Sequence, residues 1–220
     1  MILRFLFISF FCFLSSLAYA KEPLNLAYVK QEFIQYHDSG EYDHQIEAVA
    51  KEVMYYLRFR INQNKRIKHP QRLAIVFDID ETVLTNYPDM VRLNFGGTLQ
   101  EIDQLESQGH DPAIPATQVL YRYAIQHGVA VFFITGRKEY ERAATARNLA
   151  KVGFERYAGL YLKQNNYRGK SAATYKIAQR IKIEKMGYDI VENVGDQKSD
   201  LSGGHADMVF KLPNPFYIVN

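Results

Sequence analysis

The stretch that decides the fold is Leu73-Ala74-Ile75-Val76-Phe77-Asp78-Ile79-Asp80-Glu81-Thr82. Residues 73–77 are apolar without interruption, whereas a strand with one face in water alternates apolar and polar residues. A short uninterrupted run is typical of a strand buried on both faces. The sequence turns acidic at Asp78, so we expect the strand to end there and to present the polar segment at its carboxyl end.

A second run of the same kind lies at residues 129–134, a third and weaker one covers residues 190–194, and residues 207–211 suit an edge strand. Between the runs, apolar residues recur at helical spacing, and several of these segments end in glycine. We expect helices over residues 24–37, 43–64, 115–127, 139–152 and 171–186. Buried strands that alternate with helices predict an α/β fold with a doubly wound, mainly parallel, Rossmann-like sheet.

The polar residues after each run are the candidate site. Ligands of such sheets bind at the carboxyl ends of the strands. The second run ends in Thr135-Gly136-Arg137, and the third ends in Gly195-Asp196-Gln197-Lys198-Ser199-Asp200. We therefore expect these segments and residues 78–82 to meet at one edge of the sheet.

Asp78 and Asp80 lie two residues apart at the end of a buried strand. A buried charge without a partner is strongly destabilising, so a cation should lie against them. Carboxylate and carbonyl oxygens are the ligands that Mg²⁺ prefers, and Asp196 can supply another. For Asp80 alone, a loop cap that accepts hydrogen bonds from backbone amides is the alternative.

A carboxylate beside a metal, with Thr and Lys donors nearby, suits attack on phosphorus. Asp78 would be the nucleophile that forms an aspartyl-phosphate. Asp80 would protonate the leaving oxygen and then accept a proton from water. The Thr135 hydroxyl, nearby backbone amides and a lysine would neutralise the phosphate oxygens.

Together these motifs resemble the acid phosphatases of the haloacid dehalogenase (HAD) superfamily. Within it, the likeness is to plant acid phosphatases, vegetative storage proteins and bacterial class C enzymes. The resemblance implies a HAD-like sheet with a small helical cap. The matching segments occur in family order: residues 77–86, 112–116, 134–137, 148–149, 153–154, 175–176, 195–201 and 210–215.

The resemblance also implies a role for individual residues. Asp78, Asp80 (through its main-chain carbonyl) and Asp196 would be the metal ligands, and Asp78 and Asp80 would also be nucleophile and acid/base. Phosphate binding is implied at Thr135, Gly136 and Lys176, with Lys170 as a competitor for the lysine. Asp200 would position a metal-bound water or Lys176.

The amino-acid composition limits the kinds of molecule that the protein is expected to bind. The 220 residues include 27 Lys+Arg and 24 Asp+Glu, a net charge of +3, and the two signs are mixed along the chain. Binding to a nucleic-acid polymer needs a concentrated basic patch, so none is expected. The single Cys excludes a disulfide framework and a CxxC zinc site. The expected partner is a small phosphomonoester, and the oligomeric state is left open.

Residues 1–20, MILRFLFISFFCFLSSLAYA, have the layout of a secretory signal peptide: one arginine, an apolar core and an Ala-x-Ala end. The apolar core is well short of the roughly 20 residues of a membrane-spanning helix. We expect cleavage before Lys21, a secreted or periplasmic protein, and no stable membrane insertion afterwards. Residues 21–220 would form the HAD-like domain, with residues 21–70 and 87–114 contributing a small cap.

The sequence thus predicts a secreted, Mg²⁺-dependent acid phosphatase that acts through an aspartyl-phosphate. Two alternatives stay open. One is a non-catalytic storage or binding protein on the same fold, and the other is a phosphotransferase to alcohol acceptors.

Overall fold

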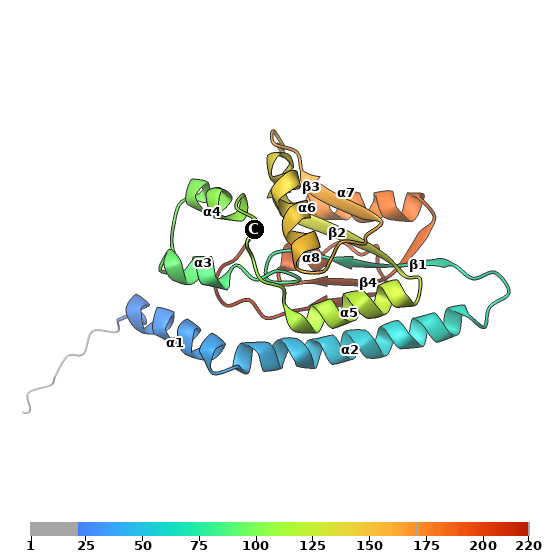
Figure 1. Ribbon diagram of the computed structural model, residues 1–220, viewed down its shortest axis with the longest axis horizontal. Coiled ribbons are helices and arrows are strands. Elements are labelled where there is room, and N and C mark those ends of the chain that lie inside the picture. Colours follow the sequence, from blue (N-terminus) through green and yellow to red (C-terminus); the bar gives the residue numbers. More distant parts are fainter. Residues whose placement is uncertain (1–21, 170, 220) are drawn as a thin grey trace, which may run out of the picture.

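A computed structural model describes residues 22–169 and 171–219 of the chain. Its five-stranded sheet is wholly parallel, in the order β3-β2-β1-β4-β5. This confirms the predicted α/β class (Figure 1). The strands are β1 (Arg72–Phe77), β2 (Ala130–Lys138), β3 (Gly159–Lys163), β4 (Tyr188–Gly195) and β5 (Met208–Lys211).

The apolar run of residues 73–77 lies in the central strand, β1. β1 pairs with β2 on one side and with β4 on the other. Four of its residues, Ala74, Ile75, Val76 and Phe77, are at most 1% exposed. Burial on both faces explains why this strand shows no alternation of apolar and polar residues.

Helices cover both faces of the sheet. Figure 1 shows α2 (Glu41–Asn64) and α5 (Pro115–Gln126) along one face and α7 (Ala172–Lys185) along the other. On the first face, Ile75 and Phe77 pack with Leu57 of α2, and on the second, Val76 packs with Ile183 of α7. The two apolar layers hold the carboxyl ends of the strands in fixed positions.

The two N-terminal helices differ in how far their side chains are buried. Helix α2 buries one stripe of side chains, Ile46, Val53, Leu57 and Ile61, in the core beneath the sheet. The structure therefore places α2 in the layer that covers the sheet, rather than in the cap expected of residues 21–70. Helix α1 (Leu26–Asp38) precedes it and has no buried residue of its own.

The insert after the first motif contains two short helices, α3 (Tyr87–Arg92) and α4 (Leu99–Glu106). A capping box begins α4, in which Thr98 and Glu101 satisfy each other's backbone N–H groups. In Figure 1 both helices lie beyond the carboxyl end of β1, beside the C-terminal segment. The insert is placed to cover the end of the sheet.

Three local expectations needed adjustment. The predicted helix over residues 139–152 is a 3₁₀ turn, η1 (Glu139–Glu141), followed by α6 (Arg142–Lys151). Strand β2 continues past the predicted end at residue 134 to Lys138. Strand β3 was not predicted, because its apolar run, Leu160-Tyr161-Leu162, is only three residues long and shorter than those of β1 and β2. The short helix α8 (Lys198–Leu201) follows β4.

Two predictions fall on residues that the structure does not describe: the signal peptide of residues 1–20, and Lys170. Across residues 22–169 and 171–219, no helix combines the length and apolar character needed to cross a membrane.

Candidate active site

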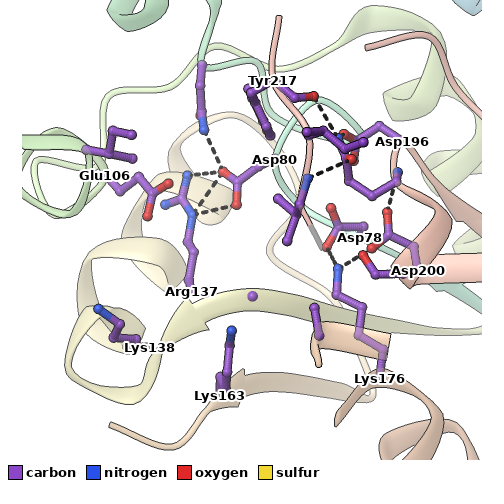
Figure 2. A pocket seen from close by; sticks show the side chains of 18 of the residues that line it. Asp78, Asp80, Glu106, Arg137, Lys138, Lys163, Lys176, Asp196, Asp200 and Tyr217 are labelled. Carbon is purple, nitrogen blue, oxygen red and sulfur yellow. Dashed lines mark hydrogen bonds and ion pairs between the residues drawn. The ribbon is translucent and has the colours of Figure 1, made fainter. Parts of the chain in front are cut away.

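A cavity of about 400 Å³ lies at the carboxyl edge of the sheet. Its walls come from the strand ends, from helices α3, α4 and α7, and from the C-terminal segment of residues 217–219. Figure 2 shows the polar side chains that gather there. Of the sequence-predicted residues, Asp78, Asp80, Gly136, Lys176, Asp196 and Asp200 line this cavity.

An acidic cluster with one lysine forms the centre of the cavity. Carboxylate oxygens of Asp78, Asp196 and Asp200 lie within 4.8 Å of one another. The Lys176 Nζ donates to Asp78 Oδ1 and to Asp200 Oδ1, each at 2.5 Å (Figure 2). All four side chains are buried. The structure thus brings together two strand ends and two helices, α7 and α8.

The charges in this cluster do not cancel. Burial and the Asp200 carboxylate raise the pKa of Asp78 well above its usual range, against the effect of the Lys176 ammonium. Burial alone would lower the pKa of Lys176, but Asp78 and Asp200 outweigh it and raise that pKa. Three carboxylates face one ammonium, so the negative charge of the site is not fully compensated and favours binding of another cation. An all-oxygen donor set fits a hard divalent metal ion, and the cluster could hold one.

Asp196 is fixed by neutral donors that leave its charge uncompensated. Gln197 Nε2 and Asn214 Nδ2 donate to its Oδ2 at 2.6 and 2.7 Å, and Thr82 Oγ1 donates to its Oδ1 at 3.3 Å. Burial is the largest cause that raises the pKa of Asp196. These hydrogen bonds fix the orientation of the Asp196 carboxylate and leave its negative charge free to bind a cation.

Asp80 is held beside the cluster by Arg137. The Arg137 Nη2 donates to Asp80 Oδ1 at 2.6 Å, and Nε lies 3.1 Å from the same oxygen. Asn86 Nδ2 donates to it as well, at 3.0 Å. Burial disfavours ionisation of Asp80, but the Arg137 guanidinium outweighs burial and holds its pKa below the usual value.

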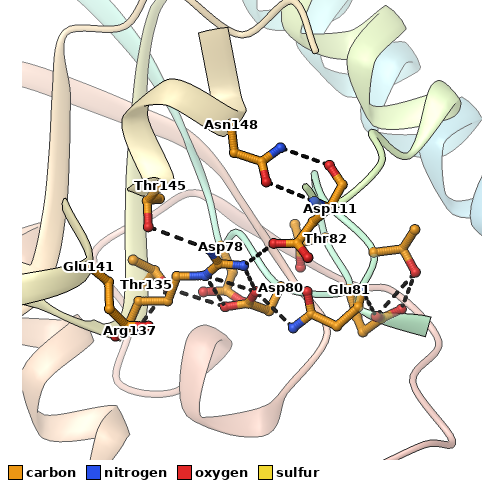
Figure 3. Close-up of polar contacts among 12 residues, drawn as sticks. Asp78, Asp80, Glu81, Thr82, Asp111, Thr135, Arg137, Glu141, Thr145 and Asn148 are labelled. Atoms are coloured by element: carbon orange, nitrogen blue, oxygen red, sulfur yellow. Dashed lines mark hydrogen bonds and ion pairs between the residues drawn. The ribbon is translucent and has the colours of Figure 1, made fainter. Parts of the chain in front are cut away.

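Arg137 is itself fixed by a second carboxylate (Figure 3). Its Nη2 donates to Asp111 Oδ2 at 2.7 Å. The backbone of Asp111 exchanges two hydrogen bonds with the Asn148 side chain of α6, each at 2.8 Å. The carboxylate of Asp80 is therefore oriented by a buried network that spans the sheet edge, the segment before α5, and α6.

Thr135 lies outside the lining of the cavity. Its hydroxyl accepts from the Arg137 backbone N–H at 3.1 Å and lies 3.5 Å from Asp80 Oδ2. Its neighbour Gly136 lines the cavity. In this structure the hydroxyl is engaged within the protein, beside the carboxylate that Arg137 holds.

Comparison with known families places the chain. The model of the HAD superfamily, subfamily IIIB (acid phosphatase), matches residues 14–220. The chain belongs to this subfamily. The resemblance drawn from the strand-end motifs is thereby confirmed, and the subfamily IIIB fold accounts for the parallel sheet.

Individual relatives agree with this membership. Acid phosphatase 1 of Solanum lycopersicum is 38% identical over 148 residues, which are 66% of this chain and 58% of the tomato protein. Vegetative storage protein 1 of Arabidopsis thaliana is 31% identical over 88% of this chain and 70% of its own. This subfamily IIIB chain thus spans about three fifths of the length of the tomato protein.

A solved structure shares the fold. The class C acid phosphatase from Bacillus anthracis superposes with a TM-score of 0.67 at 23% identity, covering 86% of each chain. At this identity the likeness concerns the fold of the subfamily IIIB chain, and it supports the assigned architecture.

Several site residues of this subfamily IIIB chain had no role in the sequence analysis. The position of Arg137 directly after Thr135-Gly136 marked it as a candidate in the sequence, but its pairing with Asp80 depends on the fold. Asn214 belongs to the closing Leu-Pro-Asn-Pro segment, which matches the family pattern, but the segment gave no role for it. Lys163 could be found only by predicting β3. Between the two candidate lysines, Lys176 is the one placed on Asp78, and Lys170 lies outside the described residues.

Proposed function

We propose that this protein hydrolyses small phosphomonoesters, with Asp78 as the nucleophile. The observation that carries the proposal is the convergence of Asp78, Lys176, Asp196 and Asp200 in one buried cluster that lines a cavity. Lys176 fixes the orientation of the Asp78 carboxylate, and two more carboxylates lie beside it. This arrangement suits transfer of a phosphoryl group better than it suits a storage protein without catalytic activity. The subfamily membership points to the same chemistry.

The proposed metal is Mg²⁺. Its ligands would be the side chains of Asp78 and Asp196 and the main-chain carbonyl of Asp80. Asp200 would position a metal-bound water or Lys176. When bound, the ion supplies positive charge that offsets the repulsion between the phosphate and the surrounding carboxylates. Lys176 contributes a second positive charge for the non-bridging phosphate oxygens and keeps Asp78 in place.

In the first step an Asp78 oxygen attacks phosphorus, and the bond between phosphorus and the ester oxygen breaks. Asp80 in its protonated form gives a proton to that oxygen, which leaves as the alcohol; because Arg137 holds the pKa of Asp80 low, the protonated fraction that this step needs grows as the pH falls. In the second step a water molecule gives a proton to Asp80 and its oxygen attacks the aspartyl-phosphate, which releases inorganic phosphate and restores the Asp78 carboxylate. Thr135 and Gly136 are proposed to bind the phosphate oxygens. Arg137 and Asn86 hold Asp80 in position for both transfers.

The size of the site favours small substrates. A cavity of about 400 Å³ under a short helical insert suits a monoester with a compact leaving group. We propose that the protein works after secretion or in the periplasm, with residues 1–20 as its signal peptide. An acid-active enzyme is the form of this function that the subfamily suggests.

The decisive variant is Asp78→Asn, which keeps the size of the side chain and removes the anionic nucleophile. We expect kcat on a chromogenic phosphomonoester to fall by about 10³-fold or more, by analogy with loss of other nucleophiles. Asp43→Asn, at an exposed position in the first turn of α2, is the matched control and should retain full activity. Circular dichroism would verify that both variants fold.

Two results would contradict the proposal. If Asp78→Asn kept near wild-type kcat, Asp78 would not be the nucleophile. A folded wild-type protein without phosphatase activity on a broad panel of esters, with Mg²⁺ present, would instead favour the storage alternative.

A further inference from the structure

Lys163 is a cation at the edge of the active-site cavity that the proposed mechanism does not use. It ends β3, and its register partner on the neighbouring strand is Lys138 of β2. Both lysines line the same cavity as Asp78 and Lys176. Figure 2 shows the Lys163 side chain between those of Lys138 and Lys176.

The two partner lysines differ in how their charge is satisfied. Lys138 Nζ donates to Asp103 Oδ2 at 2.9 Å. Within residues 22–169 and 171–219, no carboxylate lies within ion-pair distance of Lys163 Nζ. Partial burial lowers the pKa of Lys163, and the positive charges of Lys176 and Lys138 lower it further. Like charges on adjacent strands are destabilising, so this placement does not serve the fold.

The surroundings of Lys163 suit an anion that is carried by the substrate. Beside the acidic centre the cavity also has apolar walls, from Met90, Ile102 and Ile218. The carboxylate of Glu141 lines it near Arg137 and would repel an anion there. The one described cation of the cavity without an acidic partner is Lys163, and an anionic group would gain a charge-assisted hydrogen bond from it.

We propose that Lys163 binds a second anionic group of the substrate, a carboxylate or a further phosphate, in addition to the phosphate that is hydrolysed. This inference rests on the proposed phosphatase function and narrows its substrate class. Preferred substrates are phosphomonoesters whose leaving alcohol bears another negative charge. Lys163 selects them by contact with the leaving group.

The test compares two esters that differ only in that charge: 3-phosphoglycerate, with a carboxylate, and glycerol 3-phosphate, with a hydroxymethyl group in its place. The readout is the ratio of their kcat/KM values. We expect the wild-type ratio to favour the carboxylate and to fall about tenfold in Lys163→Gln, equivalent to about 1.4 kcal/mol. Lys163→Arg should restore most of it. Lys185→Gln, at an exposed position on α7, is the matched control and should leave it unchanged.

A second pair, fructose 1,6-bisphosphate and fructose 6-phosphate, distinguishes the two kinds of anion. If Lys163→Gln lowers the ratio of kcat/KM values only for the fructose pair, the subsite binds a phosphate. If the variant lowers the ratio only for the glycerate and glycerol pair, the subsite binds a carboxylate. Equal losses on all four esters, or unchanged ratios, would overturn the subsite while leaving the phosphatase function intact. A wild-type protein that hydrolyses none of the four would contradict the phosphatase proposal and the subsite with it.

Discussion

At the scale of the residue, Glu192 is unlike its neighbours. It lies within β4, is fully buried, and has no cationic partner among the described side chains. Burial raises its pKa from 4.5 to about 9. The folded protein therefore keeps a proton that the unfolded chain loses as the pH rises through this window. The free energy of unfolding should fall between pH 4.5 and 9, by about 3 kcal/mol at pH 7 for this group alone.

Glu192→Gln should remove this dependence, because the amide of glutamine does not ionise. We expect the variant to be more stable than wild type at pH 8 and to differ little from it at pH 4.5. Urea denaturation across this range would measure the difference, with Glu52→Gln at an exposed position on α2 as the control. An unchanged pH profile in Glu192→Gln would show that the carboxyl group is not buried with its proton.

At the scale of the element, α2 is joined to the turn that follows β1. Glu81 in that turn is buried and has a left-handed φ of 51°, a costly conformation for a non-glycine residue. Its carboxylate accepts from Tyr42 Oη of α2 at 2.5 Å and from the Asn86 backbone N–H at 2.6 Å. These contacts hold the strained turn that presents Asp80.

Tyr42→Phe removes only the hydroxyl that α2 gives to this turn. We expect it to destabilise the protein by about 1–3 kcal/mol, the usual cost when a buried charged acceptor loses a donor. Tyr36→Phe removes an exposed hydroxyl that donates to Gln45 Oε1, and it should cost less. Chemical denaturation of both variants gives the comparison. Equal losses would mean that Glu81 does not depend on α2.

At the scale of the whole molecule, the fold keeps three carboxylates and one ammonium together in a buried site. Their mutual repulsion opposes folding, so a cation that binds only the folded state should stabilise it. At a concentration of Mg²⁺ about a hundredfold above its Kd, the gain would be about 2.7 kcal/mol, or roughly 5–10 °C in Tm.

Calorimetry with Mg²⁺ and with EDTA would measure this shift at constant ionic strength. Asp196→Asn should reduce it strongly, because one ligand loses its charge, whereas Asp43→Asn should preserve it. An equal Tm shift in wild type and Asp196→Asn would place the binding of Mg²⁺ elsewhere.

The sequence by itself determined the class of the sheet, a strand buried on both faces at residues 73–77, and the acidic and hydroxyl residues that follow the strands. Those features are local: burial on both faces, the spacing of apolar residues, and the switch from apolar to acidic at Asp78 can all be read from neighbouring residues. It also indicated the subfamily, because the motifs occur in a fixed order along the chain.

Only the tertiary structure decided which side chains meet. Lys176 reaches Asp78 across 98 positions of sequence, and Arg137 reaches Asp80 across 57. Both contacts depend on strand order and on how helices pack, which no local pattern encodes. The position of Lys163 depends on β3, a strand whose apolar run of three residues is too short a signal. Strand register places Lys163 beside Lys138, and the packing of α7 on the sheet brings Lys176 to Asp78, so residues distant in sequence become neighbours in space.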